Sequence, residues 1–122
     1  MRCIAVVEDN PDNRLLLEAM LEDHFQVLEF ESGPDALEAI PGSNVELVLM
    51  DISLPGMDGV ETLERLRKNP KTSHIPAIAL TAHAMQGDRE RFLSLGFDNY
   101  VSKPILDHTV LIELMEELLD RK

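Results

Sequence analysis

The chain has few residues of several kinds, and each shortage argues against a class of protein. Its single cysteine, Cys3, provides neither an internal disulfide framework nor a CxxC or zinc pattern. Only 11 lysine and arginine residues stand against 23 acidic ones, and a net charge of −12 repels nucleic-acid phosphates. No apolar run approaches the roughly 20 residues that span a bilayer, and no signal peptide is visible. We therefore expect a cytoplasmic protein with no direct contact to nucleic acid or membrane.

The 122 residues suffice for one domain with one hydrophobic core, so we expect a single domain over residues 1–122. Cys3 lies in the first apolar run, where a buried small side chain is a better interpretation than a reactive thiol. The start at Met1, directly before a strand, favours a stand-alone protein, and no further domain is expected after the last helix.

Short apolar runs alternate with helical patterns along the whole chain. The predicted strands cover about residues 3–7, 26–30, 46–50, 77–80 and 99–101. The predicted helices begin at about residues 10, 32, 60, 87 and 106. This repetition predicts an α/β fold of the (βα)5 type, a doubly wound five-stranded parallel sheet with helices on both faces. Periodicity does not define strand order, but five strands fit the flavodoxin-like order 2-1-3-4-5.

Each predicted helix has an apolar face that we expect to pack on the sheet. In the first helix, the expected stripe consists of Leu15, Leu16, Met20 and Leu21. The expected inward residues of the other helices are Ala36, Leu37, Ile40, Val60, Leu63, Leu66, Leu111, Met115, Leu118 and Leu119.

Polar side chains follow the strands at the points where the strands end. Glu8 and Asp9 follow the first run, Asp51 the third and Thr81 the fourth, and Lys103 follows the fifth. In an open parallel sheet, ligands bind outside the carboxyl ends of the strands. We therefore expect three carboxylates, a hydroxyl and an ammonium group to meet at one edge of the sheet.

The electrostatic repulsion among these three carboxylates must be offset by positive charge. Two unit charges about 4 Å apart repel each other by about 4 kcal/mol at an effective dielectric constant of about 20. Oxygen ligands without histidine or cysteine favour a hard divalent cation such as Mg²⁺. Besides Glu8, Asp9 and Asp51, the main-chain carbonyl of Ser53 is a candidate ligand. Taken separately, Glu8-Asp9 is equally consistent with an acidic pair at a helix N-terminus, and an aspartate such as Asp51 is more often a turn or cap residue. Their joint occurrence at two strand ends favours the metal site.

These residues lie in segments that resemble the receiver domain of two-component response regulators, over essentially the whole chain. The matching segments are Val7-Glu8-Asp9-Asn10, Leu49-Met50-Asp51, residues 54–59, Leu80-Thr81-Ala82 and Tyr100-Val101-Ser102-Lys103-Pro104. The intervals from Asp51 to Thr81 and to Lys103 are also those of the family. The stretch after Thr81 is similar to single-domain regulators of the cell-cycle type and to receiver domains of hybrid histidine kinases.

The resemblance implies a phosphoacceptor signalling switch rather than a conventional enzyme, since such a domain catalyses its own phosphorylation and dephosphorylation. Asp51 would accept the phosphoryl group, and Mg²⁺ would be bound by Glu8, Asp9, Asp51 and the Ser53 carbonyl. Thr81 and Lys103 would contact phosphoryl oxygens. Tyr100 would be the switch aromatic, and Ser53 and His83 would control the lifetime of the phosphorylated form.

The implied partners are a sensor histidine kinase or histidine phosphotransfer protein as donor and a downstream protein target. The target would bind the surface of the fourth helix, fifth strand and fifth helix.

Two other functions fit the fold. The first is a Mg²⁺-dependent phosphatase or phosphotransferase that uses Asp51 as nucleophile on small substrates. Such enzymes usually carry a second aspartate two residues later, where this chain has Ser53, and a cap insertion that this chain lacks. The second is a nucleotide or flavin module, but the segment Glu8-Asp9-Asn10-Pro11 replaces a glycine-rich phosphate loop. Both are weaker interpretations than the signalling switch.

Overall fold

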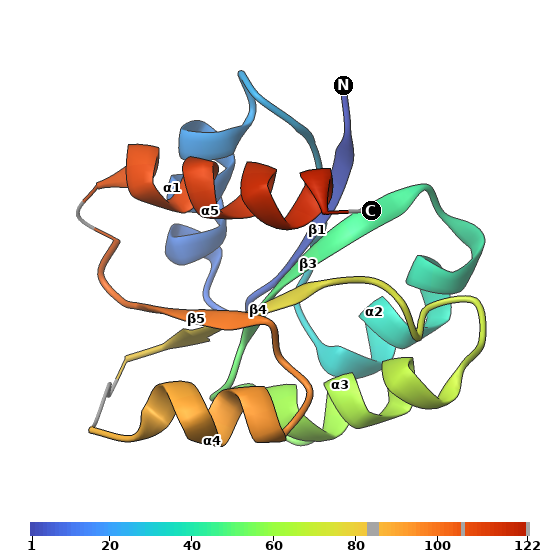
Figure 1. Cartoon of the computed structure of the whole chain (residues 1–122). Coiled ribbons are helices and arrows are strands. Elements are labelled where there is room, and N and C mark those ends of the chain that lie inside the picture. Colours follow the sequence, from blue (N-terminus) through green and yellow to red (C-terminus); the bar gives the residue numbers. More distant parts are fainter. Residues whose placement is uncertain (83–85, 106, 122) are drawn as a thin grey trace.

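The computed structural model describes residues 1–82, 86–105 and 107–121, and these form one parallel sheet with helices on both faces (Figure 1). The strands are β1 (Cys3–Val7), β2 (Gln26–Phe30), β3 (Val45–Asp51), β4 (Ala77–Thr81) and β5 (Asn99–Ser102). They pair in parallel in the order β2-β1-β3-β4-β5. The predicted α/β fold and its strand order are therefore confirmed.

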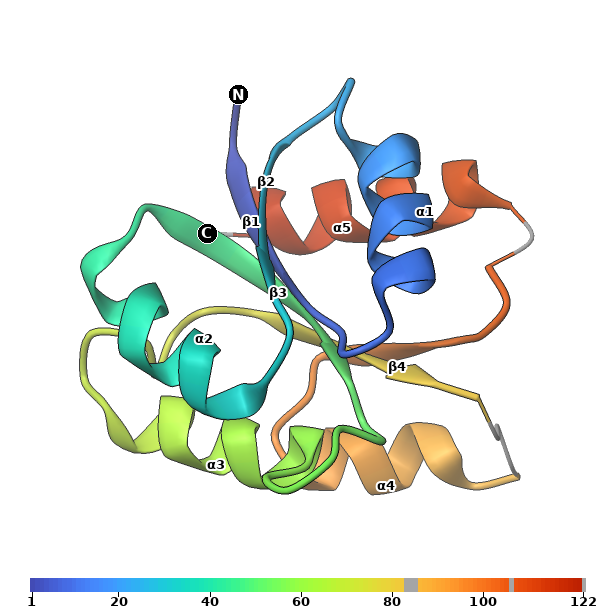
Figure 2. The same cartoon turned by 180° about the vertical axis from the view of Figure 1, so that it is seen from behind.

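The helices fall into two layers. They are α1 (Pro11–Leu21), α2 (Gly33–Ala39), α3 (Gly59–Lys68), α4 (Asp88–Ser94) and α5 (His108–Asp120), with a short 3₁₀ turn, η1 (Ile40–Gly42), after α2. Helices α1 and α5 cover one face of the sheet, and α2, α3 and α4 cover the other (Figures 1 and 2). The predicted starts are accurate to within about two residues, because Asn10, Ser32, Asp58 and Asp107 cap their helices with side-chain oxygens.

The sheet separates two apolar clusters. In β1, Ile4 and Val6 join the cluster beneath α1 and α5, while Ala5 and Val7 join the cluster beneath α2, α3 and α4. This alternation follows from the two-residue period of a strand. Strands β1 and β4 are buried along their whole length, as expected for central parallel strands. Cys3 is also buried, as predicted, and burial raises the pKa of its thiol.

The predicted apolar stripe of α1 is partly wrong. Leu15 and Leu16 are 67% and 50% exposed, whereas Leu17 and Leu21 are buried against the face that α5 covers. Three leucines in succession permit more than one inward direction, and the packing of α1 against the sheet and α5 buries Leu17 rather than its two neighbours. Met20 is partly buried against the same cluster, as expected.

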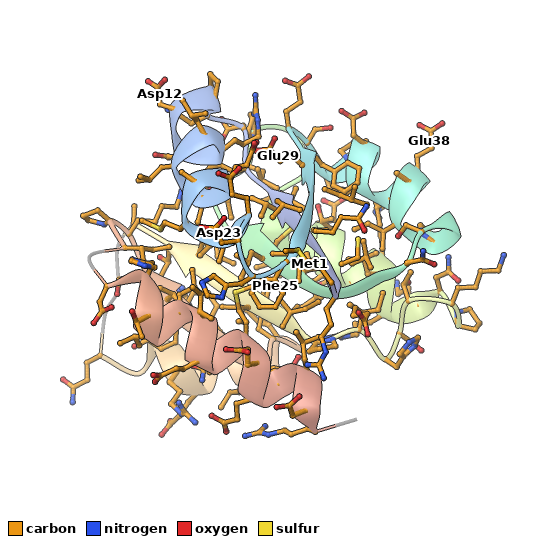
Figure 3. All side chains as sticks on the ribbon, turned by 90° about the horizontal axis from the view of Figure 1, so that it is seen from above. Met1, Asp12, Asp23, Phe25, Glu29 and Glu38 are labelled. Carbon is orange, nitrogen blue, oxygen red and sulfur yellow. The ribbon has the colours of Figure 1, made fainter. Side chains whose placement is uncertain are left out.

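The outer surface is strongly acidic. The carboxylates of Asp12 and Glu38 project away from the body of the molecule (Figure 3), and Asp23 is exposed as well. Among the described residues, no helix has both the length and the apolar character needed to cross a membrane.

Candidate functional site

Strand register brings the polar strand ends to one edge of the sheet. Val7 pairs with Met50, so the residues that follow each of them, Glu8 and Asp51, leave neighbouring strands at the same level. On the other side, Asp51 pairs with Leu80, the residue before Thr81. The convergence expected from the sequence is therefore a consequence of parallel pairing.

Three carboxylates meet at this edge. One oxygen each from Glu8, Asp9 and Asp51 lie within 4.8 Å of one another. Glu8 and Asp51 are only 1% and 3% exposed, while Asp9 is open to solvent. The set contains oxygen donors alone, lies at a solvent-accessible edge and carries excess negative charge, so its chemistry suits Mg²⁺ with water in the remaining positions.

Lys103 bridges the two buried carboxylates. Its Nζ lies 2.7 Å from Glu8 Oε1 and 2.8 Å from Asp51 Oδ2. Asp51 Oδ1 accepts a hydrogen bond of 3.0 Å from the backbone N–H of Ser53. Each oxygen of Asp51 therefore has a donor, and the ammonium group offsets part of the charge that the fold buries.

The neighbouring charges shift three pKa values. Burial raises the pKa of Glu8, and the adjacent carboxylate of Asp51 raises it further. Burial also pushes the pKa of Asp51 upward, but hydrogen bonds with Glu8 and Lys103 outweigh that effect and hold it below its ordinary value. Burial opposes the charged form of Lys103, yet the two carboxylates raise its pKa. Asp51 therefore remains ionised beside a fully charged ammonium group.

The backbone also connects the site to the neighbouring strand ends. Thr81 is buried at the end of β4, and its carbonyl oxygen accepts a hydrogen bond of 2.8 Å from the N–H of Lys103. The peptide bond from Lys103 to Pro104 is cis. Thr81 and Lys103 thus flank Asp51 from one side, as the sequence predicts.

Tyr100, the expected switch aromatic, is half-buried in β5. Its ring centroid lies 5.6 Å from that of Phe92 in α4, with 45° between the planes. Phe92 is itself buried and makes an edge-on contact with Phe97. Tyr100 therefore has a direct side-chain contact to α4 that the sequence analysis did not identify.

Helix α3 starts very close to the end of β3. A Cβ atom on Gly59 would collide with the carbonyl group of Asp51, and the N–H of Gly59 donates to the carbonyl of Ile52 at 3.1 Å. Only glycine fits such a backbone approach without displacing Asp51. Gly59 belongs to the matching segment at residues 54–59, but the sequence analysis did not identify it as a supporting residue of the site.

The first turns of α1 supply further contacts that the sequence analysis missed. Asn13 Nδ2 donates to Glu8 Oε1 at 3.2 Å. Arg14 Nη1 donates to the carbonyl oxygens of Glu8 and Asp9 at 2.8 and 3.0 Å. A helix capped by Asn10 turns these side chains back toward the end of β1, but the groups they contact there depend on how α1 packs against the sheet.

Of the two residues expected to control the phosphoryl lifetime, Ser53 and His83, the structure describes only Ser53. Ser53 is exposed beside Asp51. His83 lies outside the described residues.

The chain is similar to known proteins in both sequence and structure. The family model "Response regulator receiver domain" matches residues 4–119. The chain is 42% identical over 103 residues to the signal transduction histidine-protein kinase BarA of Escherichia coli (strain K12), covering 84% of this chain and 11% of that protein. It is 38% identical over 105 residues to the polar-differentiation response regulator DivK of Brucella ovis, covering 85% of each.

Among solved structures, the receiver domain of the sensor histidine kinase PA1611 from Pseudomonas aeruginosa PAO1 superposes with a TM-score of 0.87 at 33% identity, covering 98% of both chains. That crystal structure has a magnesium ion coordinated in the active-site cleft. The chain spans about a tenth of BarA but most of DivK. These similarities favour the signalling switch over the small-substrate phosphatase. By the extent of its family match, the chain belongs to the response regulator receiver domain family.

Proposed function

We propose that Asp51 is the phosphoacceptor of this receiver domain and that Glu8, Asp9 and Asp51 bind Mg²⁺, with the Ser53 carbonyl as a further ligand. The observation that carries the proposal is the convergence of Lys103 and two further carboxylates on the buried Asp51. The magnesium ion in the receiver domain of PA1611 supports the choice of metal. Mg²⁺, when bound, would neutralise charge on the phosphoryl oxygens.

The residues of the chain position the reacting groups. An oxygen of Asp51, kept ionised by its neighbours, attacks phosphorus in line as the P–N bond of a phosphohistidine breaks. The electron pair of that bond passes to the imidazole nitrogen of the donor. Lys103 then exchanges one of its carboxylate partners for a phosphoryl oxygen, and the hydroxyl of Thr81 binds another. Water later hydrolyses the acyl phosphate.

The phosphoryl donor in this proposal is a sensor histidine kinase or a histidine phosphotransfer protein, and the output is a contact with a downstream protein. The similarity to segments of histidine-protein kinases and to a response regulator supports this pairing. Thr81 moves toward the phosphoryl group, and Tyr100 follows and alters the surface of α4, β5 and α5. A change from a 1:99 to a 99:1 population requires the phosphoryl group to favour the active arrangement by about 5.5 kcal/mol.

The decisive experiment is phosphorylation of Asp51→Asn, using phosphohistidine donors or acetyl phosphate with Mg²⁺. We expect phosphate incorporation to fall to background, because an amide cannot serve as the acceptor. Asp23→Asn is the matched control, since this exposed aspartate precedes β2 and so lies near the amino ends of the strands, opposite the site, and should leave incorporation unchanged. Undiminished labelling of Asp51→Asn in a correctly folded sample would refute the assignment.

A further inference from the structure

Glu8 differs from a shorter aspartate in having one additional methylene group, and three donors hold its carboxylate. Oε1 accepts hydrogen bonds from Lys103 Nζ at 2.7 Å and from Asn13 Nδ2 at 3.2 Å. Oε2 accepts a hydrogen bond from the backbone N–H of Asn10 at 3.3 Å. Asn13 is therefore the side-chain donor from α1 in this set, while Lys103 comes from the end of β5.

Lys103 and Asn13 differ in what else they do. Lys103 also binds Asp51 and, under the proposed function, turns toward the phosphoryl group during transfer. Within the described part of the chain, the side chain of Asn13 makes no hydrogen bond other than the one to Glu8. The first turn of α1 fixes its position, because Asn10 caps the helix and the N–H of Asn13 donates to the cap at 3.1 Å. The amide of Asn13 thus holds one oxygen of Glu8 from a rigid element.

We propose that Asn13 is a positioning residue for Mg²⁺ binding, which keeps the longer side chain of Glu8 directed toward Asp9 and Asp51. The inference rests on the proposed function, because it concerns the geometry of the proposed Mg²⁺ ligands. A buried glutamate has an additional rotatable bond to order, and each immobilised side chain costs conformational entropy. Groups that orient metal ligands typically change metal affinity by about 10–100-fold when they are removed.

Arg14 supports the same segment in a different way. Its guanidinium group donates to the main-chain carbonyls of Glu8 and Asp9, so it fixes the backbone rather than the carboxylate. Asn13 acts on the side chain alone. A change at Asn13 should therefore depend on the length of the side chain at position 8, whereas a change at Arg14 should not.

The test exchanges one methylene group between positions 8 and 13. Mg²⁺ affinity is measured by NMR titration for the wild-type protein, Asn13→Ala, Asn13→Gln, Glu8→Asp and the double variant Glu8→Asp with Asn13→Gln. We expect Asn13→Ala to weaken Mg²⁺ binding about tenfold without lowering the melting temperature. The double variant should regain an affinity within about threefold of the wild-type value, because a longer amide meets a shorter acid. Asn44→Ala, at an exposed asparagine, is the matched control and should bind Mg²⁺ normally.

A second measurement needs no metal. In the metal-free protein, the side-chain NH₂ resonances of Asn13 should move when Glu8 is replaced by alanine, and those of Asn44 should not. Wild-type Mg²⁺ affinity in Asn13→Ala, or a double variant in which both losses simply add, would overturn the positioning role. Absence of Mg²⁺ binding by the wild-type protein would instead overturn the proposed function, and the metal-free spectra would still report on the contact between Asn13 and Glu8.

Discussion

The ring of Tyr100 in β5 packs on the buried ring of Phe92 in α4, with centroids 5.6 Å apart. The guanidinium carbon of Arg91 lies 4.6 Å from the centroid of the same Phe92 ring. A displacement of Tyr100 therefore changes the packing of α4 directly, without an intermediate residue. Because Thr81 and Tyr100 lie on neighbouring paired strands, the end of β4 and the aromatic contact belong to one packed unit.

Replacement of Thr81 by alanine should separate phosphorylation from this response. Asp51 and Lys103 are unchanged in the variant, so we expect acetyl phosphate to label it still. The NMR shifts that phosphorylation causes at Tyr100 should fall by at least half, because alanine has no hydroxyl to bind the phosphoryl group. Thr109→Ala, at an exposed threonine of α5, should retain the full shifts. Full Tyr100 shifts in Thr81→Ala would disprove the coupling.

Replacement of Lys103 by methionine should affect Mg²⁺ binding and phosphorylation in opposite directions. The variant loses the ammonium group that lies 2.7 Å and 2.8 Å from Glu8 and Asp51, so both carboxylates become better ligands for a cation. We expect tighter Mg²⁺ binding in an NMR titration. The rate of phosphorylation should fall about tenfold or more, since a hydrogen bond to a charged group contributes about 1.5–3 kcal/mol. Parallel losses of both properties would contradict this division of roles.

Stability in chelating buffer should depend on the ionisation of Glu8. Its pKa in the folded protein is raised above the ordinary value of 4.5, so its contribution to stability is complete below that pH and is lost as pH rises through the raised pKa. Glu8→Gln resembles the protonated acid. We therefore expect the variant to melt at a higher temperature than the wild-type protein at neutral pH, with a difference that shrinks toward pH 4.5.

Saturating Mg²⁺ supplies the control for that measurement. A ligand that binds only the folded state stabilises it by mass action, and the gain should be larger for the wild-type protein than for Glu8→Gln. Asp51 affects stability in a different pH range. Because its pKa in the folded protein is lowered, its contribution to stability is lost only as pH falls below the ordinary aspartate value of 3.8. A variant less stable than the wild-type protein at neutral pH without metal would show that ionised Glu8 favours folding.

Replacement of Gly59 by alanine should damage both stability and the site. The new methyl group would collide with the backbone of Asp51 and Ile52, which cannot yield as a flexible side chain does. We expect a loss of about 1–3 kcal/mol in the free energy of unfolding, measured by urea denaturation. Gly42→Ala is the matched control, since nothing lies within 4 Å of the added atom, and it should change stability by less than about 1 kcal/mol. Equal effects of the two substitutions would exclude the steric explanation.

Much of the fold was predictable because local signals repeat without conflict. The apolar runs of β1 and β2 have the predicted bounds, while β3 gains Val45 and Asp51, since its pairing with β1 and β4 continues beyond the apolar run. The inward face of α1 was not predictable in the same way. Leu15, Leu16 and Leu17 are equally apolar, and the packing of α1 against the sheet and α5 determines which of them is buried.

The candidate site also contains residues that the sequence identifies and a contact that depends on packing. Glu8, Asp51, Thr81 and Lys103 could be identified because each one follows a strand, and the ends of parallel strands lie together in any such sheet. The contact of Asn13 with the Glu8 carboxylate was not identified, since it depends on the angle at which α1 leaves the sheet.

The sequence by itself determined the succession of strands and helices along the chain, the parallel type of sheet and the polar residues at its carboxyl edge, because periodicity and capping are local properties of the chain. Only the tertiary structure decided which donors surround each carboxylate, which leucines of α1 are buried, and that Tyr100 rests on Phe92. Those contacts join residues from different elements, and their distances depend on how the helices pack against the sheet rather than on any one segment.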